Sequence, residues 1–398
     1  MSASSKGTVL VSGASIAGPA LAYWLHRFGF EVTVVERAAA LRGGGYPIDI
    51  RGTAIEVVDR MGLLPQVRAA HVDVRRITYL DADGSPLGSL RPEAITGGTE
   101  GRDVEVPRGD LADALYGAVG DDVGFRFDDS ILALHDDGAG VDVTFRNGDR
   151  CRFDLVVGAD GLHSNTRSLV FGPEEQFHHY LGRCFAGFTM PNDLGLAHEG
   201  VTWNTPGRGA VLYAPREDGV LHAFLNFARP EPPFDAFRTP EAQRDLVASV
   251  FDGAGWEVPR MVAAMRTADD LFFDVVSQIR MSAWSRGRVA LVGDAAYAPS
   301  FLSGQGSSVA LVGAYVLAGE LASTADHTAA FAAYEHRMRE FVRMNQGLAA
   351  AGGAFVAPRT AEELALRNQA LRDPAGLPGD DGRTANSALA LPAYAHAG

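Results

Sequence analysis

Cysteine is scarce in this sequence, which holds only Cys151 and Cys184 among 398 residues. Two thiols cannot form the disulfide framework of a small secreted domain, and neither lies at a spacing typical of zinc sites. We interpret both as buried small residues and expect a cytoplasmic protein without a metal site. The adjacent pair His178 and His179 is interpreted as part of a polar loop, because neighbouring side chains rarely chelate one ion.

Positive charge is also in short supply. The 35 lysine and arginine residues face 49 aspartate and glutamate residues, which gives a formal net charge of −14. Nucleic acid and anionic membrane surfaces both need a basic face on their partner, so neither is expected here. Individual arginines can still bind phosphate locally.

Long hydrophobic runs are nearly absent as well. One run, from Thr8 to Leu25, follows Lys6 and loosely resembles a signal peptide. A folded element is favoured instead, because glycine spacing and a partner strand accompany the run. No other segment is expected to approach the length of a membrane span. Since 46% of the residues are hydrophobic, we expect a globular protein with two domains, or one large domain with an inserted lobe.

The first positive signal is a β-α-β unit at the amino terminus. A β-branched run over 8–12, a helical pattern over 15–28 and a strand over 31–36 surround the stretch GASIAG, residues 13–18. In a dinucleotide-binding turn the first glycine allows the tight turn, the second admits the pyrophosphate and the third lets the helix pack on the strand. Gly13 and Gly18 fill the first and third positions.

Ser15 stands where the second glycine is expected. Its hydroxyl can donate to a phosphate oxygen or cap the helix whose N-terminus faces the anion. Glu36 follows Gly18 by 36 − 18 = 18 residues, where a carboxylate can accept both ribose hydroxyls of an adenosine. Strand, turn, helix, strand and carboxylate together predict a dinucleotide site, for either FAD or NAD.

The rest of the chain alternates between sheet and helix patterns. A hairpin is predicted over 76–90, a helix over 110–119 and a mostly antiparallel aromatic sheet over 185–227. Further predicted elements are strands at 131–135, 141–146, 151–157 and 288–292, and helices at 53–61, within 241–265, at 307–322 and at 329–350. The tail after Pro374 is expected to be loosely ordered.

Two later motifs complete the pattern. DLVVGADGLHSNTR, residues 154–167, places Asp160 at the end of an apolar strand, with Ser164 and Arg167 beyond it. RVALVGDAAYAPSFLSGQGSS, residues 288–308, places Asp294 at the end of another. In this order and spacing, with GASIAG and Glu36, the chain resembles the class A flavoprotein monooxygenases. These single-component, FAD-dependent aromatic hydroxylases include para-hydroxybenzoate hydroxylase and the tetracycline-inactivating monooxygenases.

The resemblance implies a fold and an FAD site. The fold is α/β, with a Rossmann-like FAD-binding domain of the glutathione-reductase type, an inserted β-sheet substrate domain and C-terminal helices. Glu36 would hold the adenosine ribose, Arg108 would reach the FAD, Asp160 would serve both FAD and the nicotinamide, and Asp294 would hold the ribityl or pyrophosphate region. The expected cofactor residues are Gly13, Ser15, Ile16, Ala17, Gly18, Glu36, Arg37, Arg108, Asp160, Asp294, Pro299, Gly304, Gly306 and Ser307.

The expected division of the chain follows from the same resemblance. Residues 1–75, 101–175 and 282–325 would form the FAD-binding domain, 76–100 and 176–281 the substrate domain, and 326–398 the C-terminal helices and tail. Two departures besides Ser15 stand out: Tyr297 where many relatives carry His, and a glycine-rich stretch over 43–52. The latter bears on the movement of the flavin ring and on access of the reductant.

The resemblance implies a monooxygenase. NADPH or NADH, bound only transiently, would reduce FAD, and one oxygen atom from O2 would enter an aromatic or polyketide-like small molecule through a C4a-hydroperoxyflavin. No acid-base residue is assigned, because the cofactor carries the chemistry. Candidate substrate contacts are Phe188, Trp203, Tyr213, His222, Phe224 and Pro299, although each of the sheet aromatics can equally fill the core.

Alternatives stay open at this level. They are an FAD-dependent reductase or halogenase of the same fold, and a flavin-binding protein that sequesters a hydrophobic ligand with little turnover. The sequence does not distinguish a monomer from a homodimer, and it does not distinguish hydroxylation from epoxidation or Baeyer-Villiger insertion.

Overall fold

The computed structural model describes residues 5–41, 46–92, 94, 99, 101–233, 235, 239–372 and 381–395, apart from the side chains of 351, 352, 354 and 381. Its first part is a six-stranded sheet in the order β17-β18-β11-β1-β2-β7, parallel except for the edge strand β17. The strands are β1 (Thr8–Ser12), β2 (Glu31–Val35), β7 (Gly124–Arg126), β11 (Leu155–Gly158), β17 (Ser285–Arg286) and β18 (Val289–Leu291).

The amino-terminal β-α-β unit is confirmed. Helix α1 (Ala17–Arg27) connects β1 to β2, and these strands pair in parallel from Thr8 opposite Glu31 to Ser12 opposite Val35. Gly29, with φ +94°, ends the helix and turns the chain back. The second strand ends at Val35, so Glu36 is the first residue beyond it.

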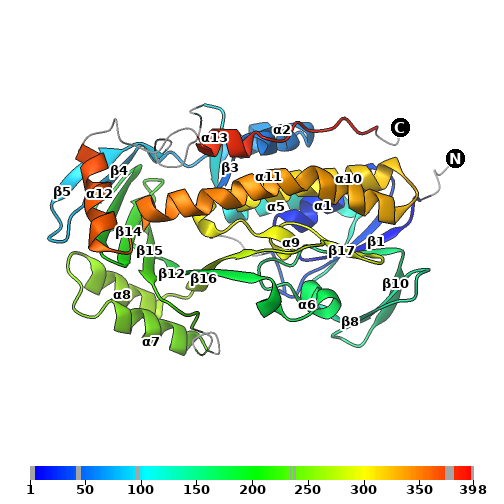
Figure 1. Cartoon of the computed structure of the whole chain (residues 1–398), viewed down its shortest axis with the longest axis horizontal. Coiled ribbons are helices and arrows are strands. Elements are labelled where there is room, and N and C mark those ends of the chain that lie inside the picture. The colour runs from blue at the N-terminus through cyan, green and yellow to red at the C-terminus, as the bar shows by residue number, and fades with distance from the viewer. Residues whose placement is uncertain are drawn as a thin grey trace.

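Helix α10 (Gly306–Ser323) packs against α1, against α2 (Thr53–Arg60) and against α11 (His327–Val356). By length and hydropathy α10 could cross a membrane, so the expectation that no further segment approaches such a span is wrong. It is 78% buried inside the molecule, as expected for a core helix of a globular protein. The 30-residue α11 runs from the parallel sheet to the second sheet and joins the two halves of the molecule (Figure 1).

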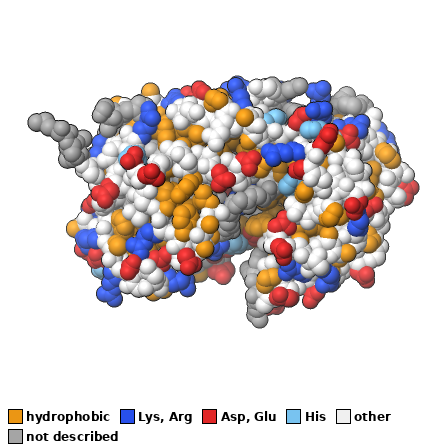
Figure 2. Space-filling model, turned by 180° about the vertical axis from the view of Figure 1, so that it is seen from behind, with side chains coloured by type: hydrophobic (Ala, Val, Ile, Leu, Met, Phe, Trp, Pro, Cys, Tyr) orange, Lys and Arg blue, Asp and Glu red, His pale blue; other side chains and the backbone are white. Residues whose placement is uncertain are grey.

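The second sheet has seven strands in the order β16-β12-β15-β14-β13-β4-β5, antiparallel except between β13 and β4. Its strands are β4 (Arg76–Leu80), β5 (Pro86–Leu90), β12 (His178–Pro191), β13 (Glu199–Thr205), β14 (Arg208–Ala214), β15 (Val220–Ala228) and β16 (Phe272–Ile279). Helices α7 (Pro240–Val250) and α8 (Val258–Thr267) cover one face, with a core that contains Leu221, Leu225 and Phe227. Seen from behind the view of Figure 1, the surface of the molecule is hollowed between the two halves (Figure 2).

Smaller elements complete the nucleotide half. They are β3 (Pro47–Ile50) paired with β6 (Val104–Pro107), the antiparallel sheet β8 (Ile131–Asp136), β9 (Val141–Phe145) and β10 (Arg150–Phe153), and the helices α3 (Leu64–Ala69), α5 (Arg108–Val119), α6 (Asn165–Phe171) and α9 (Asp294–Tyr297). The single strand predicted over 151–157 is therefore wrong. The chain makes two strands there, β10 and β11, which belong to different sheets.

The carboxyl-terminal segment corrects another expectation. Residues 381–395, expected to be loosely ordered, include α13 (Asp381–Asn386) and pack on the nucleotide half, after α12 (Ala361–Arg372). The Thr53 hydroxyl donates to the Leu389 carbonyl at 2.7 Å, and the Tyr394 hydroxyl donates to Glu320 at 2.7 Å. Residues 373–380 and 396–398 lie outside the described part of the chain.

Candidate functional site

A cavity of about 650 Å³ lies beyond the carboxyl ends of β1, β2, β11 and β18, against the N-terminus of α10. Ligands bind at this edge of open parallel sheets, because loops diverge there and helix N-termini point at the space between them. The structure brings most of the predicted cofactor residues to this one cavity: Gly13, Ser15, Ile16, Ala17, Glu36, Arg37, Arg108, Asp160, Asp294, Pro299, Gly304, Gly306 and Ser307.

The two glycines of the turn are required by contact. Gly13 has φ +107°, and a Cβ placed there would lie 2.5 Å from the carbonyl oxygen of Ala159. A Cβ on Gly18 would lie 1.8 Å from the carbonyl oxygen of Gly13. Any side chain at either position would push β1, α1 and the loop after β11 apart. Gly18 does not line the cavity itself; it lets the helix approach the turn that does.

Ser15 has a different partner from those the sequence suggested. Helix α1 begins at Ala17, and no side chain caps it, so capping by Ser15 is wrong. The Ser15 hydroxyl instead accepts a hydrogen bond from Nη2 of Arg108 at 3.2 Å. The first-turn amide of Ala17 is therefore left to a ligand in the cavity.

The Glu36 carboxylate is held in place by main-chain amides. Its Oε2 accepts from the amide of Ala14 at 2.9 Å, and its Oε1 accepts from the amide of Ala38 at 2.9 Å. Each oxygen keeps a further lone pair. A fixed carboxylate with spare acceptor capacity at the cavity wall suits the two hydroxyls of a ribose.

Asp160 organises the loop that follows β11. Its carboxylate accepts from the hydroxyl of Ser164, and from the amide and hydroxyl of Thr166 at 2.9 and 2.8 Å. Arg167, fully buried, donates to the carbonyl of Ala295 at 3.0 Å and so connects the second motif to the third. Much of the acceptor capacity of Asp160 is thus used inside the loop, and its contact with cofactors stays a prediction.

Asp294 is the most electrostatically perturbed carboxylate of the cavity. Burial raises its pKa to about 6, the nearby Arg108 opposes this shift, and Asp274 adds to it. The structure shows no hydrogen bond to this carboxylate from any residue it describes. This half-buried carboxylate lines the cavity and therefore keeps its acceptor capacity for a hydroxyl or amide of a ligand.

The loop before α10 is held in a strained conformation. Ser300, a residue with a side chain, has φ +91°, which non-glycine residues rarely adopt. Gly304 has φ +63°, and a Cβ there would lie 3.1 Å from the carboxylate of Asp49. The glycine therefore meets both a backbone and a space requirement, and Gly306 then begins α10.

An aromatic wall closes the other end of the cavity. The Tyr46 ring lies 5.8 Å from that of Phe301 and 6.1 Å from that of Phe272, and Phe301 stacks on Phe185 at 4.7 Å. All four rings line the cavity. Burial raises the pKa of the Tyr46 hydroxyl to about 12, so this phenol is neutral at physiological pH. Planar apolar ligands suit such a wall.

The predicted substrate residues separate by sheet face. Phe188 and Trp203 do not line the cavity: both are buried in the core under α7 and α8, on the face away from it. Phe224 contacts the wall, with its ring 5.9 Å from Tyr46. Tyr213 stacks on Phe224 at 5.9 Å and on His222 at 5.0 Å, so these two lie behind the wall. Pro299 lines the cavity directly.

Several further cavity residues were not predicted from the sequence, among them Tyr46, Asp49, Phe272, Asp274 and Phe301. Phe301 was within reach, since it lies in the motif that follows Asp294. Tyr46 and Asp49 belong to the glycine-rich stretch over 43–52, which was noted but not assigned to the site, and Phe272 and Asp274 come from a segment without a recognisable motif. His163 was also missed: its ring nitrogens lie 2.7 Å from Oε1 of Glu174 and 3.2 Å from Oδ1 of Asp274. These hydrogen bonds raise the pKa of His163 to about 10, and the one with Asp274 has the larger effect.

Two other features can now be placed. Tyr297 does not reach this cavity; it is buried, and its hydroxyl hydrogen-bonds with that of Tyr334 at 2.9 Å. Of the glycine-rich stretch, residues 43–45 lie outside the described part, while Tyr46, Pro47, Ile48 and Asp49 line the cavity. Within the described residues no group of three or more His, Cys, Asp or Glu side chains is arranged to hold a metal ion.

Fold and site together define a dinucleotide-binding protein with a second, β-sheet lobe facing the cavity. Residues 6–346 match the family described as "FAD binding domain", and the chain belongs to this family of class A flavin monooxygenases. An uncharacterized protein of Mycobacterium tuberculosis is 47% identical over 90% of this chain and 96% of its own length. A flavin-dependent monooxygenase from an unknown prokaryotic organism is 40% identical over 90% and 94%.

The fold is shared with a solved relative. The crystal structure of the tetracycline destructase Tet(55) superposes with a TM-score of 0.85 and 37% identity, covering 98% of this chain and 99% of that one. The chain is therefore an FAD-dependent monooxygenase by family. Its substrate is a separate question.

The residues present fit FAD. Gly13 and Gly18 have no room for a Cβ, so the tight turn and the close packing of α1 on it that a dinucleotide site needs both depend on them, and Asp294 offers a half-buried carboxylate without a protein donor. Glu36 would hold the adenosine ribose, Arg108 the phosphates, and Asp294 a hydroxyl of the ribityl chain. Bound there, FAD supplies hydride acceptance and the activation of O2.

Proposed function

We propose that this protein uses NADPH or NADH and O2 to insert one oxygen atom into a planar aromatic or polyketide-like small molecule. The balance is substrate, O2, NAD(P)H and one proton giving oxygenated substrate, NAD(P)+ and water. One observation carries the proposal. A single cavity is lined at one end by the dinucleotide turn and at the other by the rings of Tyr46, Phe272 and Phe301.

The protein's own residues would position the reactants and exclude water. The aromatic wall orients a flat substrate by stacking and removes water from the reacting region. The N-terminus of α10, which begins at Gly306, directs free amides and a positive dipole end into the cavity, where they stabilise developing negative charge. Arg108, which is close enough to interact electrostatically with Asp294, adds a positive charge to the cavity.

The substrate class is supported by shape and by one neighbour. Tet(55) is named a tetracycline destructase, and tetracyclines are flat fused-ring polyketides; this chain shares its fold over nearly the whole length. Modification of an antibiotic, or a step in secondary metabolism, is the setting that we propose. We also propose a cytoplasmic location. The protein would be a monomer or a homodimer, and its mass in solution, compared with the 42.2 kDa of one chain, distinguishes the two.

The test measures oxygen insertion directly. The purified, FAD-loaded protein is given NADPH or NADH and a panel of phenols and polyketides under ¹⁸O2, and products are analysed by mass spectrometry. Incorporation of one labelled oxygen, with NAD(P)H consumption stimulated by the same compound, is the expected result. Consumption that yields only hydrogen peroxide or a reduced product with every compound contradicts it, and a halogenated product in the presence of chloride favours the halogenase alternative.

A variant pair ties the activity to the aromatic wall. Phe272 lines the cavity and Leu194 does not, and both side chains are 39% exposed. Phe272→Ala should raise the KM for the organic substrate by about tenfold, because the lost ring burial is on the order of 1.5 kcal/mol. Leu194→Ala should leave KM unchanged. Equal effects of both variants would place the substrate elsewhere.

A further inference from the structure

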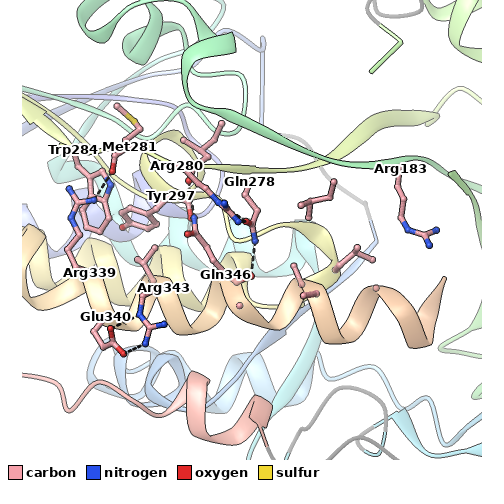
Figure 3. A pocket seen from close by; sticks show the side chains of 18 of the residues that line it. Arg183, Gln278, Arg280, Met281, Trp284, Tyr297, Arg339, Glu340, Arg343 and Gln346 are labelled. Atoms are coloured by element: carbon pink, nitrogen blue, oxygen red, sulfur yellow. Dashed lines mark hydrogen bonds and ion pairs between the residues drawn. The ribbon is translucent and has the colours of Figure 1, made fainter. Parts of the chain in front are cut away.

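A second cavity, of about 1080 Å³, lies on the other side of the loop that walls the FAD cavity. It is bounded by β12, by the chain after β16 and by α11, and Leu302 lines both cavities. Figure 3 shows Gln278 and Arg280 projecting toward Gln346 on α11, with Arg183 at the far end. None of the predicted cofactor or substrate residues lines this space.

The lining is strongly basic for a chain with a net charge of −14. Five arginines border the cavity, Arg183, Arg280, Arg339, Arg343 and Arg359, against the carboxylates Glu340 and Glu363. Two of these arginines are neutralised: Arg343 pairs with Glu340 at 2.5 Å, and Arg339 pairs with Glu335 at 2.6 Å. Among the residues that the structure describes, Arg183, Arg280 and Arg359 have no carboxylate within ion-pair distance.

Arg183 is the decisive residue. Its side chain is 2% exposed, and its Nη1 has no hydrogen-bond partner among the described residues. Burial, with repulsion from Arg359, lowers its pKa to about 10, yet it remains a cation at neutral pH. A buried cation without a partner lowers the stability of the folded state, and an apolar residue of similar size at this position would not carry that cost.

The backbone is shaped to aim this side chain. The pairing of β12 with β16 is interrupted between Tyr180 and Arg183, where a β-bulge shifts the register. Bulges re-aim side chains and are common beside binding sites. The same bulge brings Arg359 close, since its guanidinium donates to the carbonyl of Leu181. Two cations thus converge at one end of the cavity.

Arg280 lies nearer the FAD cavity, and its partner is the side-chain amide of Gln278 and not a carboxylate. Its guanidinium donates to Oε1 of Gln278 at 3.1 and 2.7 Å. The amide nitrogen of Gln278 donates in turn to the carbonyl of Pro299, at 3.0 Å, and to that of Gln346, at 2.8 Å. Pro299 lines the FAD cavity, so a ligand that engages Arg280 acts on a residue bracing the flavin loop.

We propose that this second cavity binds a small organic anion with two acidic groups, phosphate or carboxylate, one held by Arg183 and Arg359 and the other by Arg280. Guanidinium groups bind such oxyanions in a planar, two-pronged geometry, and an anion would give Arg183 the partner it lacks. The site is distinct from the FAD cavity and does not depend on the proposed substrate.

The test is calorimetric titration of the FAD-loaded protein with three probes: pyrophosphate, citrate and 2′,5′-adenosine bisphosphate. Pyrophosphate or citrate binding identifies a compact anion with two or more acidic groups, and binding of the bisphosphate alone identifies a nucleotide. Arg280→Gln and Arg359→Gln, both at exposed positions, should each weaken binding by about tenfold or more, because a charge-assisted hydrogen bond is lost. Arg266→Gln is the matched control and should not change binding, because Arg266 is an exposed arginine of α8 that pairs with Asp245 of α7 and does not line the cavity.

A second measurement separates binding from folding. Arg183→Met should abolish binding and at the same time raise the melting temperature of the ligand-free protein, because a buried unpaired charge is removed. A purely structural arginine would instead lower the melting temperature when replaced. Absence of saturable binding by all three probes at millimolar concentration, or binding that Arg280→Gln and Arg359→Gln leave unchanged, would overturn the proposal.

Discussion

The hydroxyl of Ser15 accepts a hydrogen bond from the guanidinium of Arg108 at 3.2 Å, across 93 residues of sequence. This contact ties the first turn of the nucleotide fold to the start of α5. It explains how a serine can occupy a position usually given to glycine: the side chain points at a cation of the same site, so it does not fill the space that the backbone needs.

We expect Ser15→Gly to retain FAD, with at most a few-fold loss of affinity, because one neutral acceptor of Arg108 is removed and the turn is unchanged. Gly13→Val should lose FAD, since its Cβ would lie 2.5 Å from the carbonyl oxygen of Ala159. Flavin absorbance of the purified variants measures both. Retention of FAD by Gly13→Val would contradict the placement of this turn.

The Asp294 carboxylate should lower the stability of the FAD-free protein at neutral pH but favour the binding of FAD. Its pKa rises from 3.8 to about 6 on folding, so the folded state binds more protons and the free energy of unfolding falls as pH rises through this window. The loss is on the order of 2–3 kcal/mol above pH 6. Asp294→Asn should therefore raise the melting temperature of the FAD-free protein at pH 7, and this gain should shrink toward pH 4.

Asp294→Ala should in contrast lose FAD, measured by flavin absorbance at pH 7, because the acceptor for the cofactor hydroxyl is gone. If Asp294→Asn destabilises the FAD-free protein equally at pH 5 and pH 8, the pKa of this half-buried carboxylate is not raised by folding. Gly117→Ala, on the exposed side of α5, is a suitable reference for FAD binding, since nothing lies within 4 Å of a Cβ there and the residue does not line the cavity.

His163 should stabilise the protein in the acidic range. Its pKa rises from 6.5 to about 10 because of hydrogen bonds with Asp274 and Glu174. This contribution is fully present below pH 6.5 and is lost as pH rises toward 10. His163→Asn should lower the melting temperature most at pH 6 and least near pH 10. The change in melting temperature should be modest, since the His163 side chain is 47% exposed and solvent screens the charges.

The control is His26→Asn. His26 lies 3.6 Å from Asp122, with both side chains exposed, and its loss should change stability by less than about 0.5 kcal/mol at any pH. A pH-independent effect of His163→Asn would show that the ring acts by packing alone.

Tyr297 and Gly313 should be energetically coupled. A Cβ on Gly313 would lie 1.9 Å from the hydroxyl oxygen of Tyr297 but 3.2 Å from the ring carbon that carries it. Gly313→Ala should therefore destabilise strongly, Tyr297→Phe alone should cost about 1 kcal/mol through the lost hydrogen bond with Tyr334, and the double variant should be more stable than the sum predicts. Denaturant unfolding of all four proteins gives the coupling energy. Strict additivity would contradict this packing.

Much of the local structure could be predicted because its signals are short-range. The unit β1-α1-β2 and the hairpin of β4 and β5 carry strand alternation, turn glycines and a helix stop within a few residues of each other. The strand predicted over 151–157 failed for the same reason: β10 and β11 form one continuous β-patterned run, and only their different partners divide it.

The substrate wall shows where alternation stops being informative. Along β15, Leu221, Ala223, Leu225 and Phe227 face one side and His222, Phe224 and Asn226 the other, and neither side is fully exposed. A strand covered on both faces has no polar side to orient the pattern. Whether Phe188 or Phe224 meets the cavity was therefore undecidable until the position of α7 and α8 was known.

The sequence alone determined the class of fold, the dinucleotide turn and the glycines and carboxylates at the nucleotide end of the cavity, because strict backbone requirements leave these residues at fixed spacing. Only the tertiary structure decided which sheet face forms the substrate wall, where Ser15 points, that residues 381–395 pack on the core, and that Arg183, Arg280 and Arg359 surround a second cavity. These features depend on contacts between segments far apart in the chain, and such contacts leave no local pattern.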